Sequence, residues 1–145
     1  MPHPVKVLFV CMGNCVRSQM AEAIARHDAS DIIAPESAGV HPLGFIDNTT
    51  QRVLRERGIS FDGQYSKGTR DHSLKKPDLI VNISGVPGST LFAGLKFEDW
   101  QIDDPFGEAI ETHRRICDDI ERNVRELAAR LRAQRHVEIL FCEYL

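Results

Sequence analysis

The residues best suited to chemistry lie close to the start of the chain. Cys11 is followed by five residues and then by Arg17 and Ser18, which gives the spacing Cys-x5-Arg-Ser. A thiolate is a strong nucleophile. A guanidinium offers a planar fork of donors that matches two oxygens of a tetrahedral oxyanion. Cys11 beneath a bound phosphate would therefore be placed to attack phosphorus. The alternative interpretation is a buried structural cysteine beside a surface arginine.

The elements that flank this motif favour the first interpretation. The apolar run Val5–Val10 predicts a buried strand, and apolar residues at helical spacing predict a helix from about Ser18 to His27. A loop that enters a helix points free N–H groups inward, with the helix dipole behind them. Glycine and asparagine tolerate the left-handed conformations that wrap such a loop. No Gly-Lys-Ser/Thr ends the loop, which argues against a Walker nucleotide loop. We expect an oxyanion cradle formed by Met12, Gly13, Asn14, Cys15, Val16, Arg17 and Ser18.

A carboxylate with complementary chemistry follows a later strand. Lys96–Ile102 is a strand candidate, and Asp103, Asp104 and Pro105 come directly after it. Expelling an alcohol or phenol from phosphorus requires a proton donor. Loops just past strand ends are where ligands bind in open α/β sheets. We predict that Asp104 is the proton donor. Asp103 is the alternative candidate for this role, or it is a cap near the following helix or a surface charge.

The remaining pattern alternates strands with helices. Further strands are expected at Ile32–Ser37, where Pro35 favours an edge position, and at Asp78–Ser84. Further helices are expected from Asn48 or Thr49 to Gly58, over Asp71–Leu74, and from Glu108 or Ala109 to Arg132. This order predicts a three-layer α/β/α fold with a central four-stranded parallel sheet, the phosphate-binding loop following its first strand.

Composition limits the classes of function. The chain has 145 residues, a net charge of −3 and 27% charged residues, which is typical of one globular domain with no basic field for nucleic acid or membrane. Its apolar runs are too short to span a bilayer. Four scattered cysteines suggest neither a disulfide scaffold nor a zinc site. A nucleophilic thiol needs a reducing compartment, so we expect a cytoplasmic enzyme, without cofactor or metal, as a monomer or weak dimer.

Cys11–Ser18, continued by Gln19-Met20-Ala21-Glu22, resembles the low-molecular-weight protein tyrosine phosphatase family and the arsenate reductases that share its fold. The likeness extends from about Val5 to about Arg132. It implies a phosphocysteine mechanism in which the Asp before Pro, here Asp104, is the general acid. It also implies a substrate cleft with Phe106 as one wall, and Met12 is a candidate for the opposite wall.

Other features divide the two branches of that family. Gln19-Met20-Ala21-Glu22 is closer to the reductases, whereas Phe106-Gly107 is closer to the phosphatases. Thioredoxin-coupled reductases need two more cysteines after the third strand, and this chain has Ser84 where one is expected. We therefore predict a phosphatase acting on a phosphomonoester, with protein phosphotyrosine the favoured substrate. Reduction of arsenate by an external thiol and a non-catalytic oxyanion-binding module remain as alternatives.

Two departures from the family pattern concern the surroundings of the loop. The family often has a cysteine directly before the arginine, where this chain has Val16, while Cys15 stands one residue earlier. Cys15 could line the substrate mouth, form a reversible disulfide with Cys11, or pack. The family also has a histidine-bearing segment where this chain reads Gly63-Gln64-Tyr65-Ser66-Lys67, so the support of the loop is altered.

The end of the chain is unexpectedly apolar. We divide the chain into a domain over residues 1–135 and a tail over residues 136–145, and seven of the ten tail residues are apolar or aromatic: Val137, Ile139, Leu140, Phe141, Cys142, Tyr144 and Leu145. β-Branched and aromatic content favours an extended segment. The tail is expected to be ordered, as an edge strand or a coil over its own domain, or docked on a partner chain.

Overall fold

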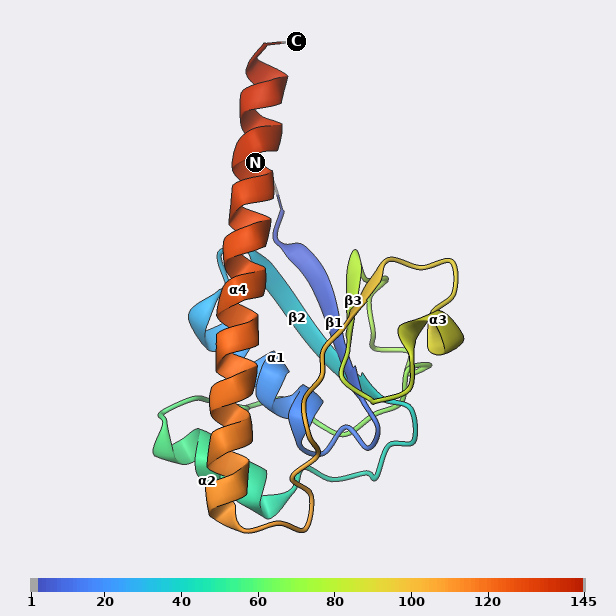
Figure 1. The fold of residues 1–145 in the computed structure, drawn as a ribbon, viewed down its shortest axis with the longest axis vertical. Coiled ribbons are helices and arrows are strands. Elements are labelled where there is room, and N and C mark those ends of the chain that lie inside the picture. The colour runs from blue at the N-terminus through green and yellow to red at the C-terminus, as the bar shows by residue number, and fades with distance from the viewer. Residues whose placement is uncertain (1–2, 145) are drawn as a thin grey trace.

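The computed structural model describes residues 3–144 and contains one parallel sheet of four strands (Figure 1). The strands are β1 (Val5–Cys11), β2 (Ile33–Gly39), β3 (Leu79–Asn82) and β4 (Phe97–Asp99), in the spatial order β2-β1-β3-β4. All three pairings are parallel. The four strands expected from the sequence are therefore confirmed, and so is the α/β fold.

The strand register brings the carboxyl ends of the strands to one edge. β1 pairs with β2 from Val5 opposite Ile33 to Cys11 opposite Gly39, and it pairs with β3 on its other side. Pro35 lies in β2, which is an edge strand as predicted. No strand lies on the outer side of β2, so the missing N–H of Pro35 deprives no neighbouring strand of a hydrogen bond there. Every loop that follows a strand consequently leaves from the edge where Cys11 lies.

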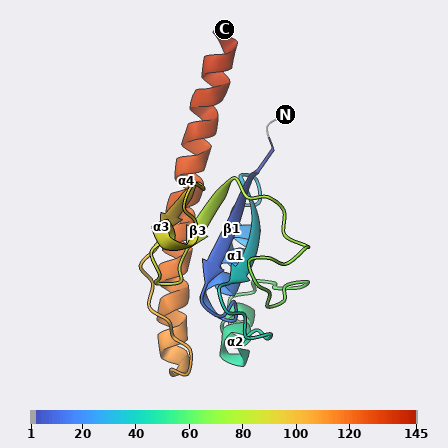
Figure 2. The same cartoon turned by 90° about the vertical axis from the view of Figure 1, so that its right-hand side faces the viewer.

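The two faces of the sheet are covered differently. Val7 and Phe9 of β1 pack in the main core with α1 (Arg17–Asp28), α2 (Asn48–Glu56) and α4 (Ile110–Glu143). The alternate residues of β1 face a smaller cluster, which includes residues of the short helix α3 (Gly88–Leu91) and of the irregular chain before β3. Figure 2 shows α4 passing beside the sheet and continuing beyond it.

α4 is attached by the stripe expected from helical spacing. From His113 to Leu131 one side of this helix is buried, and Arg132 forms an ion pair with Asp31, with N–O distances of 2.9 and 2.8 Å. The buried residues are His113, Ile116, Cys117, Ile120, Val124, Leu127, Ala128 and Leu131. Such a stripe on the sheet-facing side anchors a helix to a core.

Two local expectations are wrong, and one short helix was not expected. The chain at 71–74 forms turns, with the Leu74 N–H donating to the Asp71 carbonyl, rather than a helix. The helix α3 was missed because glycines and a proline around it indicate a break. The tail is neither an edge strand nor a coil: it continues α4 to Glu143, across the boundary placed at residue 135. Arg, Gln, Glu and Leu in this region are strong helix formers, and an existing helix extends cheaply. Leu145 lies outside the described residues.

Candidate active site

The loop after β1 is held from outside by the chain that follows β2. The N–H groups of Val40, His41 and Leu43 donate to the carbonyls of Cys11, Met12 and Gly13, at 3.1, 2.8 and 3.0 Å respectively. The Asp47 N–H donates to the Cys15 carbonyl at 3.0 Å. A loop whose carbonyls are bound on its outer side is arranged to turn its N–H groups toward the centre, as anion-binding loops do.

Two residues make this loop shape attainable. Asn14 has a φ of 48°, in the left-handed region that few side chains tolerate. Gly39, at the end of β2, lies so close that a Cβ there would be 2.8 Å from the Asn14 nitrogen and 2.9 Å from the Met12 oxygen. The loop and the strand end are therefore in direct backbone contact, which only glycine permits.

A directed chain of hydrogen bonds ends at the Cys11 sulfur. The Asn14 amide nitrogen donates to Ser18 Oγ at 2.7 Å and to Ser37 Oγ at 3.0 Å. Ser37 in turn donates to the buried carboxylate of Glu22 at 2.6 Å. Because Ser18 Oγ accepts from Asn14, its own hydrogen is free to point at Cys11 Sγ, 2.9 Å away. This arrangement suits a thiolate at Cys11.

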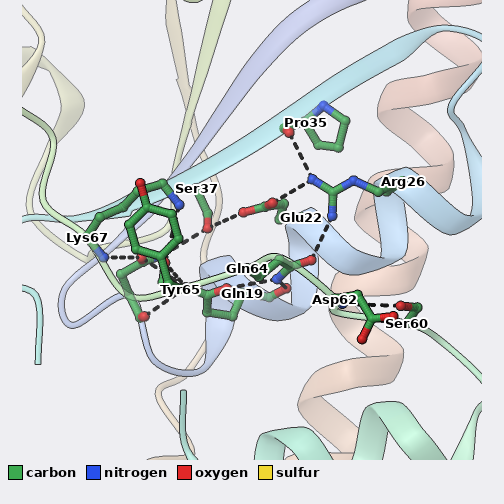
Figure 3. Close-up of polar contacts among 11 residues, drawn as sticks. Gln19, Glu22, Arg26, Pro35, Ser37, Ser60, Asp62, Gln64, Tyr65 and Lys67 are labelled. Atoms are coloured by element: carbon green, nitrogen blue, oxygen red, sulfur yellow. Dashed lines mark hydrogen bonds and ion pairs between the residues drawn. The ribbon is translucent and has the colours of Figure 1, made fainter. Parts of the chain in front are cut away.

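The other end of the Asn14 side chain is fixed by a relay of two glutamines. Asn14 Oδ1 accepts from Gln19 Nε2 and from the Lys67 N–H, each at 2.9 Å. Gln64 donates to Gln19 Oε1 at 2.8 Å, and Arg26 donates to Gln64 at 2.8 Å (Figure 3). Gln64 and Lys67 lie in the segment that lacks the family's histidine, and their hydrogen bonds supply the altered support.

Arg26 joins this relay to the serine chain. Its Nη2 also donates to Glu22 at 2.6 Å and to the Pro35 carbonyl at 3.3 Å. One half-exposed guanidinium therefore holds the outer ends of both chains that converge on Asn14 (Figure 3).

Arg17 is fixed by the ends of two other strands. This guanidinium is 6% exposed, and its Nη1 donates to the Ile83 carbonyl at 2.7 Å and to the Ile102 carbonyl at 3.0 Å. Its Nη2 lies 3.5 Å from the Asp104 carboxylate. Its Nε is buried and has no hydrogen-bond partner among residues 3–144. A buried N–H donor left open in this way is expected to meet a ligand.

The structure brings Asp104 to Arg17 but gives Asp103 no such contact. Asp104 is half exposed, and its other oxygen accepts the Phe106 N–H at 3.0 Å. Phe106, which is 48% exposed, is thereby tied to this carboxylate through its main chain. Leu43, 49% exposed, lies over Gly13 and forms part of the rim with the half-buried Met12. Sequence reasoning missed Leu43, because only the hydrogen bond to Gly13 brings it there.

The side chains of Cys15 and Val16 are both buried and pack in the main core. Burial raises the pKa of the Cys15 thiol to about 12, and the negative charges of Cys11, Asp104 and Asp47 add to this effect. Cys15 is consequently a neutral, packed thiol.

With this geometry established, the fold and loop define an α/β protein with a cysteine–arginine loop at its first strand-to-helix turn. Residues 6–137 match the model of the low molecular weight phosphotyrosine protein phosphatases, and the chain belongs to that family of enzymes. A glutaredoxin arsenate reductase from Synechocystis is 32% identical over 135 residues, which covers 87% of this chain and 98% of the relative.

Solved structures give the same assignment. An arsenate reductase in its phosphate-binding state has a TM-score of 0.78 at 31% identity and covers 88% of this chain and 98% of its own. The YwlE arginine phosphatase from Geobacillus stearothermophilus has a TM-score of 0.76 at 27% identity, covering 90% and 95%. Within residues 3–144, no helix is long and apolar enough to cross a bilayer, and no cluster of three metal-binding side chains occurs.

Gly39→Ala should displace the loop, because its new Cβ would overlap backbone atoms of Met12 and Asn14. We expect a loss of about 1–3 kcal/mol in the free energy of unfolding, together with weaker phosphate binding by calorimetry. Gly68→Ala is the matched control, since its Cβ would make only ordinary contacts, with Pro42 at 3.5 Å and with the Gly39 oxygen at 3.9 Å. Equal effects of the two substitutions would contradict the proposed close contact.

Cys15 should resist alkylation at neutral pH, because its pKa of about 12 leaves almost no thiolate. In a Cys11→Ser protein, peptide mass mapping after iodoacetamide should find Cys15 unmodified while the exposed Cys142 is labelled. Rapid labelling of Cys15 in the folded protein would show that it is accessible and ionised.

Proposed function

We propose that this protein is a cysteine-dependent phosphatase in which Cys11 is the nucleophile. The observation that carries the proposal is the convergence of three groups. Ser18 Oγ lies 2.9 Å from Cys11 Sγ, the open Nε of Arg17 is buried in the same site, and Asp104 lies 3.5 Å from Arg17 Nη2. The proposed nucleophile and oxyanion clamp lie at the two ends of the loop after β1, and the proposed proton donor lies on the segment after β4, at the same sheet edge.

In the first step the Cys11 thiolate attacks phosphorus, and the bond between phosphorus and the ester oxygen breaks. Arg17 and the N–H groups of residues 12–18 stabilise the equatorial oxygens. Asp104, in its protonated form, delivers its proton to the leaving oxygen. Because Arg17 is anchored to two carbonyls, its fork is already oriented when the substrate enters.

In the second step Asp104, now ionised, removes a proton from water. The water oxygen bonds to phosphorus, the sulfur–phosphorus bond breaks, and inorganic phosphate leaves with the Cys11 thiolate restored. The cradle itself supplies the positive charge that this chemistry requires, so the mechanism uses no cofactor or metal ion.

The rim of the site favours an aromatic phosphoester. Leu43 and Phe106 are each about half exposed, and Met12 is half buried. Leu43 and Met12 belong to the wall of the loop, while the main chain of Phe106 is bound to Asp104. A phenyl ring attached to the phosphate would be held between these apolar side chains. We therefore propose phosphotyrosine on a protein as the substrate class, and a reducing compartment such as the cytoplasm as the location.

Arsenate reduction by an external thiol is the second candidate, and the identity to reductases supports it. An internal disulfide relay is disfavoured by the positions of the thiols. Cys117 lies on the buried side of α4, in the core, and Cys142 is exposed near the end of that helix. The segment after β3 contains Ser84, whose hydroxyl cannot form a disulfide. External thiols would have to supply both electrons.

The deciding assay compares both reactions with the same purified protein. We expect turnover of p-nitrophenyl phosphate, and no arsenite from arsenate with thioredoxin alone. Cys11→Ser should abolish turnover but retain phosphate binding, because the cradle does not need the sulfur. Arsenite production with glutathione and glutaredoxin, without phosphatase activity, would establish the second candidate. Phosphate binding without either reaction would indicate a binding module.

Asp104→Asn should lower the turnover number about 10²–10⁴-fold for substrates with poor leaving groups, because the amide has no proton to give. The loss should be smaller for p-nitrophenyl phosphate, whose leaving group needs little protonation. Asp103→Asn is the matched control, one residue away and without a contact to Arg17 among the described residues. Loss of activity in the control alone would reverse the assignment.

A further inference from the structure

The end of α4 leaves the domain and is surrounded by solvent. Arg135 makes the last hydrogen bonds to the body, from Nη1 to the Asp31 carbonyl at 3.2 Å and from Nη2 to the His3 carbonyl at 2.7 Å. Every residue from 136 to 144 is exposed. Figures 1 and 2 both show these turns projecting beyond the sheet. The projecting helix extends beyond residue 137, where the family match ends.

The projecting helix carries a regular apolar stripe rather than scattered apolar residues. Ala133, Val137, Leu140 and Tyr144 follow one another at spacings of four, three and four residues. This is the alternation of d and a positions in a coiled coil. The three large side chains are 62%, 42% and 89% exposed, and Phe141 adjoins them. Apolar area of this kind, without cover in its own chain, marks an interaction surface.

The stripe faces away from the body of its own subunit. At about 100° per residue, Leu140 lies on the opposite side of α4 from the buried Leu131, nine residues earlier. The stripe is consequently open to a partner, whereas Ile139 lies on another side of the helix.

We propose that the stripe pairs with the same stripe of a second copy of this chain, as an antiparallel two-helix contact. Opposite helix directions place Val137 against the partner's Leu140, and Ala133 against the partner's Tyr144. The twofold axis repeats both of these residue pairs, so the surface is self-complementary, as an isologous dimer requires. Ala133, the smallest side chain of the stripe, thereby packs against the partner's Tyr144, the largest.

Charge supports the antiparallel direction. The last turn of α4 contains Glu143 and no basic residue, so its charge adds to the negative end of the helix dipole. His136 and Glu143 both flank the stripe, seven residues apart. In the antiparallel pair, Glu143 lies beside the partner's His136, an imidazole that can carry positive charge. Parallel helices would instead stack Tyr144 on the partner's Tyr144 and leave the two alanines facing a gap.

The length of the stripe sets the strength of the contact. Twelve residues, from 133 to 144, extend about 18 Å along the helix axis. An interface of this size lies toward the small end of protein–protein contacts. The dimer should therefore be reversible and dependent on protein concentration.

Sedimentation velocity over a range of concentrations tests the surface with a matched pair of variants. Leu140 and Ile139 are neighbours with nearly equal exposure, 42% and 43%, but only Leu140 belongs to the stripe. The native chain and Ile139→Glu should form dimers, whereas Leu140→Glu should remain monomeric with an unchanged circular dichroism spectrum. Val137→Glu should behave like Leu140→Glu. A native chain that stays monomeric at all concentrations, or a dimer indifferent to Leu140→Glu, overturns the proposal.

Cysteine cross-linking tests the direction of the helices. In a Cys142→Ser background, Val137→Cys and Leu140→Cys are made separately and oxidised mildly. The antiparallel layer predicts a disulfide-linked dimer only when the two proteins are mixed, because residue 137 faces the partner's residue 140. Efficient dimers in each protein alone would indicate parallel helices and overturn the proposed direction.

Discussion

The left-handed turn at Asn14 is the constraint on which the rest of the site depends. An asparagine with a φ of 48° is unfavourable by itself, and here both ends of its amide are committed. The nitrogen donates to Ser18 and Ser37, and the oxygen accepts from Gln19 and Lys67. These bonds hold the backbone in a shape that would otherwise relax, and they orient Ser18 toward the Cys11 sulfur.

The parallel sheet explains why such distant segments reach one loop. The ends of β1, β2 and β3 lie at the same edge, so the chain after β2 binds the outer side of the loop and Ile83 binds Arg17 from the other side. The extended residues after β4 supply the second carbonyl, from Ile102, just before Asp104. Asp104 is thereby placed by the same arginine that would hold the oxyanion, since its carboxylate lies 3.5 Å from Nη2.

The strands and the loop were predictable from the sequence because their signals are local. Val5–Val10 is apolar throughout, and Cys11, Arg17 and the following helix lie within a short stretch. The partners of Asn14 were not predictable, since Gln64 and Lys67 come from an irregular segment about 50 residues later. Their positions depend on how that segment packs, which no spacing rule describes.

The structure of the tail was predicted wrongly because its local preference for an extended chain was given too much weight. Val137, Ile139 and Phe141 raise the local preference for an extended chain, but strand formation also requires a sheet edge to pair with. α4 arrives at residue 135 as a formed helix, with Arg135 tied to the His3 carbonyl. Adding turns to this helix fixes one residue per hydrogen bond, without the cost of a new nucleus. Its apolar residues consequently form a stripe on a free helix instead of a strand.

The positions of the thiols bear on which reaction the site supports, hydrolysis of a phosphoester or reduction of arsenate. A loop that binds tetrahedral oxyanions serves phosphate and arsenate alike, so the cradle does not distinguish phosphatases from reductases. The distinction depends on whether a second thiol can reach the first. Cys15 is neutral and packed in the core, Cys117 lies on the core-facing side of α4, and Cys142 lies on the projecting helix. In the proposed mechanism, hydrolysis needs only water and Asp104 after the first step, so it requires no second thiol.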